Sequence, residues 1–383
     1  MLNTNDDLYV HEQYKFGSKE KERSEFEDHV RRVLAAQQAL AAQHAPGNPQ
    51  RVFHAKAHAC LAGKLTLIED RPAITRHGIF ADNGKRAYNV LARFSSGVGF
   101  DQHDLKPDVR GLALKIFGVS DGSTPGEQRK TRTFDGLMTN STNPFGKDQD
   151  EFVRFMEANV NPGLLGINLI GFLLGHADVA RLLMKATFKI MPSLATAQYW
   201  SGHPYLLGPR LAMKFNVRPL DDAPAEIDND LQQAMSNHQA GVDAGSDNLG
   251  AQVRRWFEMH TVGSAKVNPN YLSVELRNRL QRGPIKFVFA VQLEKDAGAT
   301  PLENGLTEWK ESDSPSIPVA ELSLEREIDA NLGRALRFTP GNFVADHRPL
   351  GNLGRGRIFT YEASQTGRHA AAEEPDERIF FDA

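Results

Sequence analysis

Cysteine is almost absent from this chain of 383 residues, in which Cys60 is the single example. A lone cysteine cannot form an intrachain disulfide, and it excludes the four-cysteine type of zinc site. The chain also has little net charge, because 45 basic and 48 acidic side chains leave a formal net charge of −3. The sequence therefore offers no general basic surface for DNA or RNA, and we expect no nucleic-acid partner.

Long apolar segments are also missing. The longest, GLLGINLIGFLLG at residues 163–175, would extend about 20 Å as a helix, whereas the bilayer core is about 30 Å thick. The first 28 residues lack the apolar region of a secretory signal and are too acidic for a transit peptide. Together with the single cysteine, these features predict a cytoplasmic protein without a membrane-spanning helix.

Residues 163–191 join this apolar run to a stretch with three basic side chains, Arg181, Lys185 and Lys189. A buried helical hairpin is the simplest interpretation. A mixture of this kind also suits peripheral contact with a membrane surface, and an apolar hairpin can equally form a subunit interface. All three interpretations stay open at this point.

The composition is that of a globular protein, with 40% hydrophobic and 24% charged residues. Residues 24–43 open with a Ser-x-x-Glu capping box and continue with apolar side chains at helical spacing. They predict an N-terminal helical arm over residues 1–45. Four strand-like runs bounded by Gly, Asp or Asn follow, at 51–70, 88–96, 109–118 and 134–139.

Residues 149–200 have a helical pattern and form an insertion before two further strand-like runs, at 203–218 and 284–294. Groups of strands that alternate with groups of helices fit one large α+β domain with an antiparallel sheet. We place this domain at residues 46–365. Residues 366–383 are interpreted as a C-terminal tail.

A histidine among small and apolar residues, His54, occurs early in the first strand-like run, in RVFHA at residues 51–55. Such a residue is more often a hydrogen-bonded core or surface histidine than a catalytic one. His54 and His58 are four residues apart, a spacing that would let both ligate a metal if the segment were helical. The strand-like alternation that follows and the lack of an evident third ligand argue against a zinc site here.

Three further stretches carry polar side chains. ARFSS at 92–96 and PDVRGLALK at 107–115 each suit an ordinary strand with an arginine at its edge, and LMTN ends at Asn140 in a polar turn. Near the C-terminus, Arg357 and Tyr361 are four residues apart and would share one face of a helix. An arginine beside a phenol favours the phenolate through charge and hydrogen bonding.

These stretches resemble the motifs of the haem catalase superfamily in order and in spacing. RVFHA resembles the distal Arg-x-x-His-Ala strand, and ARFSS and PDVRGLALK resemble the Arg-Phe-Ser and Asp-x-Arg-Gly-x-Ala-x-Lys strands. The C-terminal stretch resembles the proximal signature Arg-x-Phe-x-Tyr, with a further arginine, Arg368, seven residues after the tyrosine. The resemblance covers about residues 50–370. It implies an α+β fold, namely a catalase-like antiparallel eight-stranded β-barrel with surrounding helices and one haem b.

The resemblance also implies roles for individual residues. Tyr361, as a phenolate favoured by Arg357, would be the iron ligand. His54 would move a proton between the two peroxide oxygens, with Ser95 fixing its ring and Asn140 orienting the peroxide. The further cofactor-binding residues would be Arg51, Arg93 and Arg368 at the propionates and Phe53, Phe145 and Phe152 in a dry distal pocket.

Departures from the family pattern bear on the substrate. Phe53 stands where catalases normally have a valine, and on a strand its side chain would lie on the face opposite His54. One residue is missing after the asparagine turn, and the chain is shorter than typical catalases. These features resemble the smaller catalase-related haem proteins, some of which act on fatty-acid hydroperoxides.

We therefore predict a haem-dependent enzyme that cleaves the O–O bond of an organic hydroperoxide. A fatty-acid hydroperoxide is preferred, because of Phe53 and the apolar residues 163–175. The alternatives are a small true catalase or peroxidase that acts on hydrogen peroxide, and a haem-binding protein without turnover. We expect the protein to form a homo-oligomer.

Overall fold

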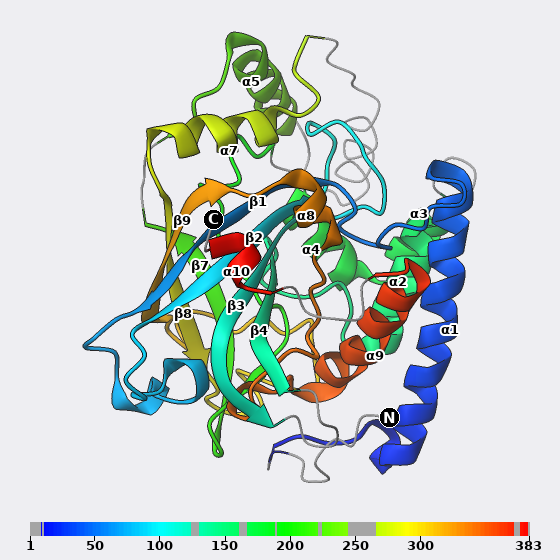
Figure 1. The fold of residues 1–383 in the computed structure, drawn as a ribbon. Coiled ribbons are helices and arrows are strands. Elements are labelled where there is room, and N and C mark those ends of the chain that lie inside the picture. Colours follow the sequence, from blue (N-terminus) through cyan, green and yellow to red (C-terminus); the bar gives the residue numbers. More distant parts are fainter. Residues whose placement is uncertain are drawn as a thin grey trace.

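A closed β-barrel forms the centre of the protein (Figure 1). The computed structural model describes residue 9 and residues 11–123, 130–160, 167–187, 190–220, 224–243, 266–370 and 376–381. Parts of the predicted arm (residues 1–8 and 10), of the predicted hairpin (163–166, 188 and 189) and of the predicted tail (371–375, 382 and 383) lie outside this description.

The strands form one antiparallel sheet in the order β5-β4-β3-β2-β1-β9-β8-β7-β6. Because β5 pairs with both β4 and β7, eight strands close into a barrel and β6 stays at the edge beside β7. The predicted eight-stranded antiparallel barrel is therefore confirmed. Its strands are β1 Ala57–Leu67, β2 Ala87–Ser96, β3 Arg110–Ser123, β4 Lys130–Thr139, β5 Tyr199–Trp200, β6 Tyr205–Leu207, β7 Leu211–Pro219, β8 Ile285–Leu293 and β9 Ile317–Glu327.

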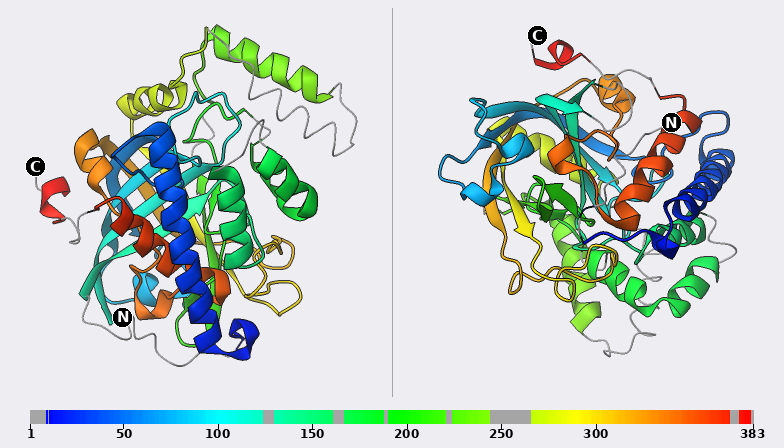
Figure 2. Two further views of the ribbon diagram at one scale, coloured as in Figure 1. Left: turned by 90° about the vertical axis from the view of Figure 1, so that its right-hand side faces the viewer. Right: turned by 90° about the horizontal axis from the view of Figure 1, so that it is seen from below.

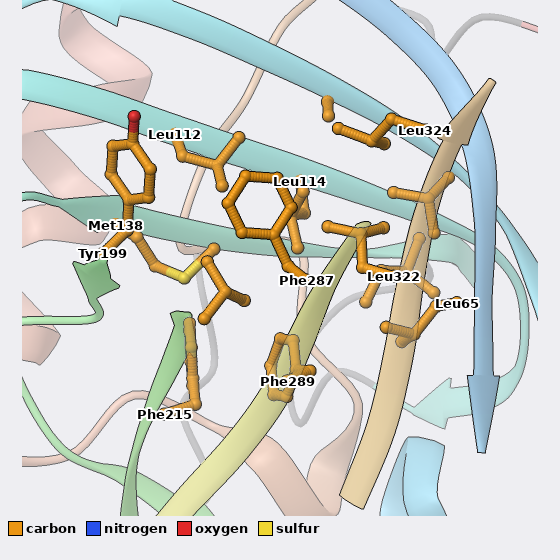
Figure 3. Close-up of a cluster of buried hydrophobic side chains, with 14 of the residues drawn as sticks. Leu65, Leu112, Leu114, Met138, Tyr199, Phe215, Phe287, Phe289, Leu322 and Leu324 are labelled. Carbon is orange, nitrogen blue, oxygen red and sulfur yellow. The ribbon is translucent and has the colours of Figure 1, made fainter. Parts of the chain in front are cut away.

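Apolar side chains fill the barrel interior (Figure 3). They recur at every second residue of a strand, since successive strand residues point to opposite faces. Burial of one such side chain contributes about 1.5–3 kcal/mol to stability. The labelled members of this core are Leu65, Leu112, Leu114, Met138, Tyr199, Phe215, Phe287, Phe289, Leu322 and Leu324. With the interior occupied by side chains, a large ligand must bind beside the barrel.

Helices surround the barrel on several sides, and α1, α2 and α9 lie together on one of them (Figures 1 and 2). Helices α5 and α7 lie at one end of the barrel (Figure 1). The helices are α1 Lys19–His44, α2 Gln149–Val160, α3 Ile167–Gly175, α4 Ala177–Thr187, α5 Asn229–Asp243, α7 Tyr271–Arg282, α8 Ala330–Ala335, α9 Gly351–Gly367 and α10 Arg378–Phe381. None of the helices in the described ranges is long and apolar enough to cross a membrane.

Helix α1 begins earlier than the sequence predicted. Its N-cap is Ser18, whose Oγ accepts a hydrogen bond from Lys21 N at 3.3 Å. The capping box assigned to Ser24 is therefore wrong, because that residue lies inside the helix. The preceding residues 19–23 are all lysine, glutamate or arginine, and these strong helix formers extend the helix upstream to the next available cap.

The stability of the fold should depend on pH through His347, which is fully buried. Burial lowers the pKa of its ring to about 4, whereas an unfolded histidine has a pKa of about 6.5. The unfolded chain therefore binds more protons between these values, and stability falls as the pH falls below about 6.5. At pH 5 this loss amounts to about 2 kcal/mol.

Urea unfolding of the wild type and of His347→Gln at pH 7.5 and pH 5 measures this effect. The wild type should lose about 2 kcal/mol more than the variant between the two conditions. Equal losses in the two proteins would show that His347 is not the source of the pH dependence.

Candidate functional site

A cavity of about 260 Å³ lies beside the barrel, where strands β2, β3 and β4 face helices α2 and α9. Segments that are far apart in the sequence meet there. The predicted site residues that line it are Arg51, Phe53, His54, Arg93, Ser95, Phe145, Phe152, Arg357, Tyr361 and Arg368. The one predicted site residue outside this lining is Asn140.

His54 lies in a loop, because β1 begins only at Ala57 and not at residue 51 as predicted. Its φ of 60° is left-handed, a conformation that costs about 1–3 kcal/mol for a residue other than glycine. Its backbone N donates to Gly97 O at 2.8 Å. The ring Nδ1 lies 3.1 Å from Ser95 Oγ, so the surrounding contacts hold the imidazole in one orientation.

The surroundings of His54 keep its ring uncharged. Loss of hydration lowers the pKa of the imidazole to about 3, and the positive charges of Arg93, Arg357 and Arg51 act in the same direction. A ring with this pKa is neutral at every pH from about 5 upward. It therefore carries a free lone pair that can accept a proton under physiological conditions.

Phe53 lines the same cavity as His54. The expectation that it would point to the opposite face of a strand is wrong, because both residues precede β1. Its ring centroid lies 5.9 Å from that of Phe152 and 6.3 Å from that of Phe155. Phe145 in turn lies 5.3 Å from Phe155, so these rings form a continuous apolar wall.

Helix α9 places Arg357 and Tyr361 on one face, as their spacing predicted. Nη2 of Arg357 donates to the Tyr361 hydroxyl at 3.0 Å, and the guanidinium carbon lies 5.2 Å from the ring centroid. Burial works against the charge of Arg357, but Tyr361 and Tyr205 keep the pKa of its guanidinium above the ordinary value. A charged donor at a phenol oxygen is the kind of hydrogen bond that stabilises an oxyanion.

His203, which the sequence analysis missed, extends this contact. Nη1 of Arg357 lies 2.6 Å from His203 Nδ1, and Nδ1 must accept because a guanidinium only donates. Burial and the charge of Arg357 hold the pKa of His203 well below its ordinary value. Since 154 residues separate the two side chains, no local sequence pattern could have marked His203.

Two carboxylates fix the beginning of α9 and hence the position of Tyr361. Gly351 N donates to Glu12 Oε1 at 3.0 Å, and Asn352 N donates to Glu303 Oε2 at 2.7 Å. Negative side chains are favourable here because the first backbone N–H groups of a helix lack partners and the helix dipole is positive at this end.

Three arginines form a positively charged edge of the cavity. Arg51 Nη2 donates to Leu336 O at 2.6 Å, and Arg93 Nη2 donates to His54 O at 2.9 Å. Within the described part of the chain, neither these two residues nor Arg368 forms an ion pair with a carboxylate.

The three positive charges at this edge of the cavity repel one another. Loss of hydration lowers the pKa of all three guanidinium groups, for Arg368 to about 10. The charge of Arg93 adds to the effect at Arg51 and Arg368. Arg93 Nε is buried and has no hydrogen-bond partner among the described residues. An anionic ligand would relieve both the repulsion and this unsatisfied donor.

Asn140 is held outside the cavity by two hydrogen bonds. Its Oδ1 accepts from Arg110 N at 2.8 Å, and its Nδ2 donates to Ala186 O at 3.0 Å. The amide therefore ties the end of β4 to the start of β3 and to the end of α4. That Asn140 orients a peroxide stays a prediction, and it would require the amide to leave these partners.

Known proteins resemble this chain in sequence. The family model described as Catalase matches residues 34–124. A protein named catalase-related peroxidase, from Mycolicibacterium paratuberculosis (strain ATCC BAA-968 / K-10), is 27% identical over 361 residues, which cover 89% of this chain and 98% of that protein.

Solved structures with the same fold complete the comparison. Catalase A from Saccharomyces cerevisiae has a TM-score of 0.61 and 17% identity, covering 86% of this chain and 63% of that one. A fungal catalase has a TM-score of 0.63 and 17% identity, and the match covers 87% of this chain and 62% of that one. A bacterial catalase has a TM-score of 0.60 and 19% identity, and the match covers 87% of this chain and 60% of that one. In sequence and in fold, this chain is similar to proteins of the catalase superfamily. The chain spans about three fifths of the length of the solved catalases it matches.

Gly111 lies against the His54 ring. A β-carbon at this position would stand 2.6 Å from the ring atoms Cε1 and Nδ1 and 2.8 Å from Ser95 Oγ. We predict that Gly111→Ala turns the ring and breaks its contact with Ser95, while the barrel stays folded. A crystal structure, or the nitrogen-15 shifts of the His54 side chain, would reveal the change.

Gly136→Ala is the matched control on the neighbouring strand. A β-carbon there meets Phe215 and Phe134 no nearer than 3.5 Å, an ordinary van der Waals distance, so His54 should keep its place. An unmoved ring in the Gly111→Ala protein would contradict the close packing described here.

Proposed function

We propose that this protein is an oxidoreductase of the catalase superfamily, which binds haem b and cleaves the O–O bond of a hydroperoxide. One observation carries the proposal: a single cavity joins the His54–Ser95 contact, the Arg357–Tyr361 pair and a set of arginines that form no ion pair with a carboxylate of the described residues. A neutral base, a phenol with a charged donor and an anion-binding edge are the groups that this chemistry needs.

The residues of the cavity fit haem b. Its two propionates are carboxylates, and Arg51, Arg93 and Arg368 are cations without carboxylate partners in the described chain. The orphaned Arg93 Nε would gain an acceptor. Tyr361 offers the phenol oxygen that is the iron ligand type recorded for catalases. We therefore assign Tyr361 as the iron ligand and the three arginines as the propionate-binding residues.

When bound, haem b supplies the ferric iron at which a peroxide O–O bond breaks. His54 supplies the proton movement. If Ser95 Oγ accepts the hydrogen of Nδ1, the tautomer is fixed and Nε2 becomes the base. Nε2 takes the proton from one hydroperoxide oxygen and returns it to the departing oxygen. Arg357 meanwhile holds negative charge on the Tyr361 oxygen by donating to it.

An organic hydroperoxide, and specifically a fatty-acid hydroperoxide, is the substrate that we favour. The wall of Phe53, Phe145, Phe152 and Phe155 is apolar and excludes water, which strengthens the polar contacts beside it. Burial of each chain methylene contributes about 0.8 kcal/mol, a gain that hydrogen peroxide cannot make. Turnover of hydrogen peroxide by a small true catalase or peroxidase is the alternative.

The remaining parts of the proposal concern partners. Buried leucines of α3 and α4 pack with the phenylalanines of the cavity wall, which supports the helical-hairpin interpretation of this segment. Leu174 is nevertheless 75% exposed, and the side chains of Arg181 and Lys185 on α4 are each 66% exposed, so we retain peripheral membrane contact through residues 163–191. We further propose a cytoplasmic homo-oligomer.

His54→Ala tests the proposed function most simply. The variant should bind haem normally but react with a hydroperoxide at least ~10²-fold more slowly, because the group that moves the proton is lost. The wild-type rate should show no inflection near pH 6.5, since the pKa of His54 is lowered to about 3. Stopped-flow measurements with hydrogen peroxide and with linoleic acid hydroperoxide give both results.

His44→Ala, at the exposed end of α1, is the control and should react like the wild type. Equal rates for His54→Ala and the wild type would exclude the acid–base role. A haem-loaded wild type that turns over neither substrate would favour the haem-binding protein without turnover.

Phe53→Val tests the substrate preference. The smaller side chain takes apolar surface away from the cavity wall, and each substrate methylene that is then no longer buried forfeits about 0.8 kcal/mol. The ratio of hydrogen peroxide activity to lipid hydroperoxide activity should therefore rise several-fold. The measurement compares kcat/KM for the two substrates. Phe172→Val, which changes a half-buried ring that packs with the same cluster on α3, is the matched control. An unchanged ratio in Phe53→Val would mean that Phe53 only packs the wall.

A further inference from the structure

A second group of metal-ligating side chains lies where α1 packs against α2 (Figure 1). Glu25 and His29 are four residues apart on α1 and so share one helix face. Asp150 stands in the first turn of α2. One nitrogen or oxygen atom of each residue lies within 4.8 Å of those of the other two.

The distances suit a shared metal ion better than a hydrogen bond. His29 Nε2 lies 3.4 Å from Asp150 Oδ1, longer than the 2.7–3.2 Å of an ordinary N–H···O bond. Two ligands of one tetrahedral zinc ion, each about 2.0–2.1 Å from it, are about 3.3–3.4 Å apart. The observed separation therefore matches two ligands of one ion.

Two polar atoms of this group are buried and have no hydrogen-bond partner in the described part of the chain. They are Glu25 Oε2 and His29 Nδ1. The other oxygen of Glu25 accepts from Lys15 Nζ at 2.6 Å, and the His29 side chain is only 1% exposed. A buried polar atom without a partner costs about 1–3 kcal/mol. Glu25 Oε2 is thus an acceptor that the described residues leave unused, whereas Asp150 Oδ1 also accepts from Arg32 Nη1 at 3.1 Å. If His29 ligates through Nε2, the nitrogen that faces Asp150, its Nδ1 carries the ring hydrogen and is not a ligand.

The charge state of this group also suits a cation. Among the described residues, the ion pairs around this group form two separate networks. One joins Glu25 and Asp148 to Lys15, the other contains Asp150, and together they hold one more carboxylate than base. The acids are Glu25, Asp28, Asp148, Asp150 and Glu157, and the bases are Lys15, Arg31, Arg32 and Arg154.

We propose that Glu25, His29 and Asp150 bind a divalent transition-metal ion of the zinc type. One imidazole nitrogen and two carboxylate oxygens form a donor set that zinc accepts. The Glu25 and Asp150 side chains are 17% and 27% exposed, which gives the ion a path from solvent. The ion links α1 to α2, and α2 is the helix that carries Phe152 of the cavity wall. This site is independent of the hydroperoxide chemistry proposed above.

Isothermal titration of zinc chloride into the holoprotein, after removal of divalent ions with EDTA, tests the site. The wild type should bind one zinc ion per chain and unfold at a higher Tm with zinc than without it. Glu25→Gln and Asp150→Asn should weaken binding at least ~10²-fold, because the loss of outer-sphere partners alone costs 10–100-fold. Glu25→Gln keeps an oxygen for Lys15, so the helix should stay in place.

Glu27→Gln is the matched control, since Glu27 lies on the same helix and its side chain is 58% exposed. It should bind zinc as tightly as the wild type. X-ray absorption of the zinc-loaded wild type should show one imidazole among oxygen ligands, a result that does not require any variant to fold. The proposal is overturned if the wild type binds no zinc, if the two ligand variants bind it equally well, or if the ion has no imidazole ligand.

Discussion

The hydrogen bond from the Arg357 guanidinium to the Tyr361 hydroxyl organises the whole candidate site. Its length is 3.0 Å, and the same guanidinium also reaches His203 Nδ1 at 2.6 Å. Because arginine stays charged at every accessible pH, the phenol oxygen faces a permanent positive charge in a place with little water, where such interactions are strong. The carboxylates of Glu12 and Glu303 at the start of α9 hold this helix in register with the cavity.

The arginines that line the cavity give it an excess of positive charge. Burial is the main cause of the low pKa of His54, and Arg93, Arg357 and Arg51 lower it further. The field that attracts an anion therefore also helps to keep the proposed base neutral. Without an anion these charges repel one another and destabilise the fold. In the proposed function the haem propionates provide the missing negative charge, and cofactor binding is then linked to stability. The same arginines thus attract an anion and add to the effect of burial on His54.

The barrel could be predicted from the sequence, and ten of the eleven predicted site residues line one cavity, because their signals are short motifs in a fixed order. Contacts that depend on tertiary packing could not be predicted from the sequence. The contact of His203 with Arg357 joins distant segments, and the amide of Asn140 is engaged by backbone groups from two other elements. Phe53 enters the cavity only because the chain before β1 leaves the strand, with a left-handed residue at His54. None of these outcomes has a local pattern.

Resonance Raman spectroscopy of the haem-reconstituted protein tests the central claim most directly. If Tyr361 is the iron ligand, the wild type shows iron–phenolate vibrations, and Tyr361→Phe loses them. Tyr205→Phe is the matched control, because Tyr205 is also buried near Arg357 and its hydroxyl has no hydrogen-bond partner in the described chain; this variant should keep the vibrations. Phenolate vibrations that persist in Tyr361→Phe, or a wild type that takes up no haem, would contradict the account.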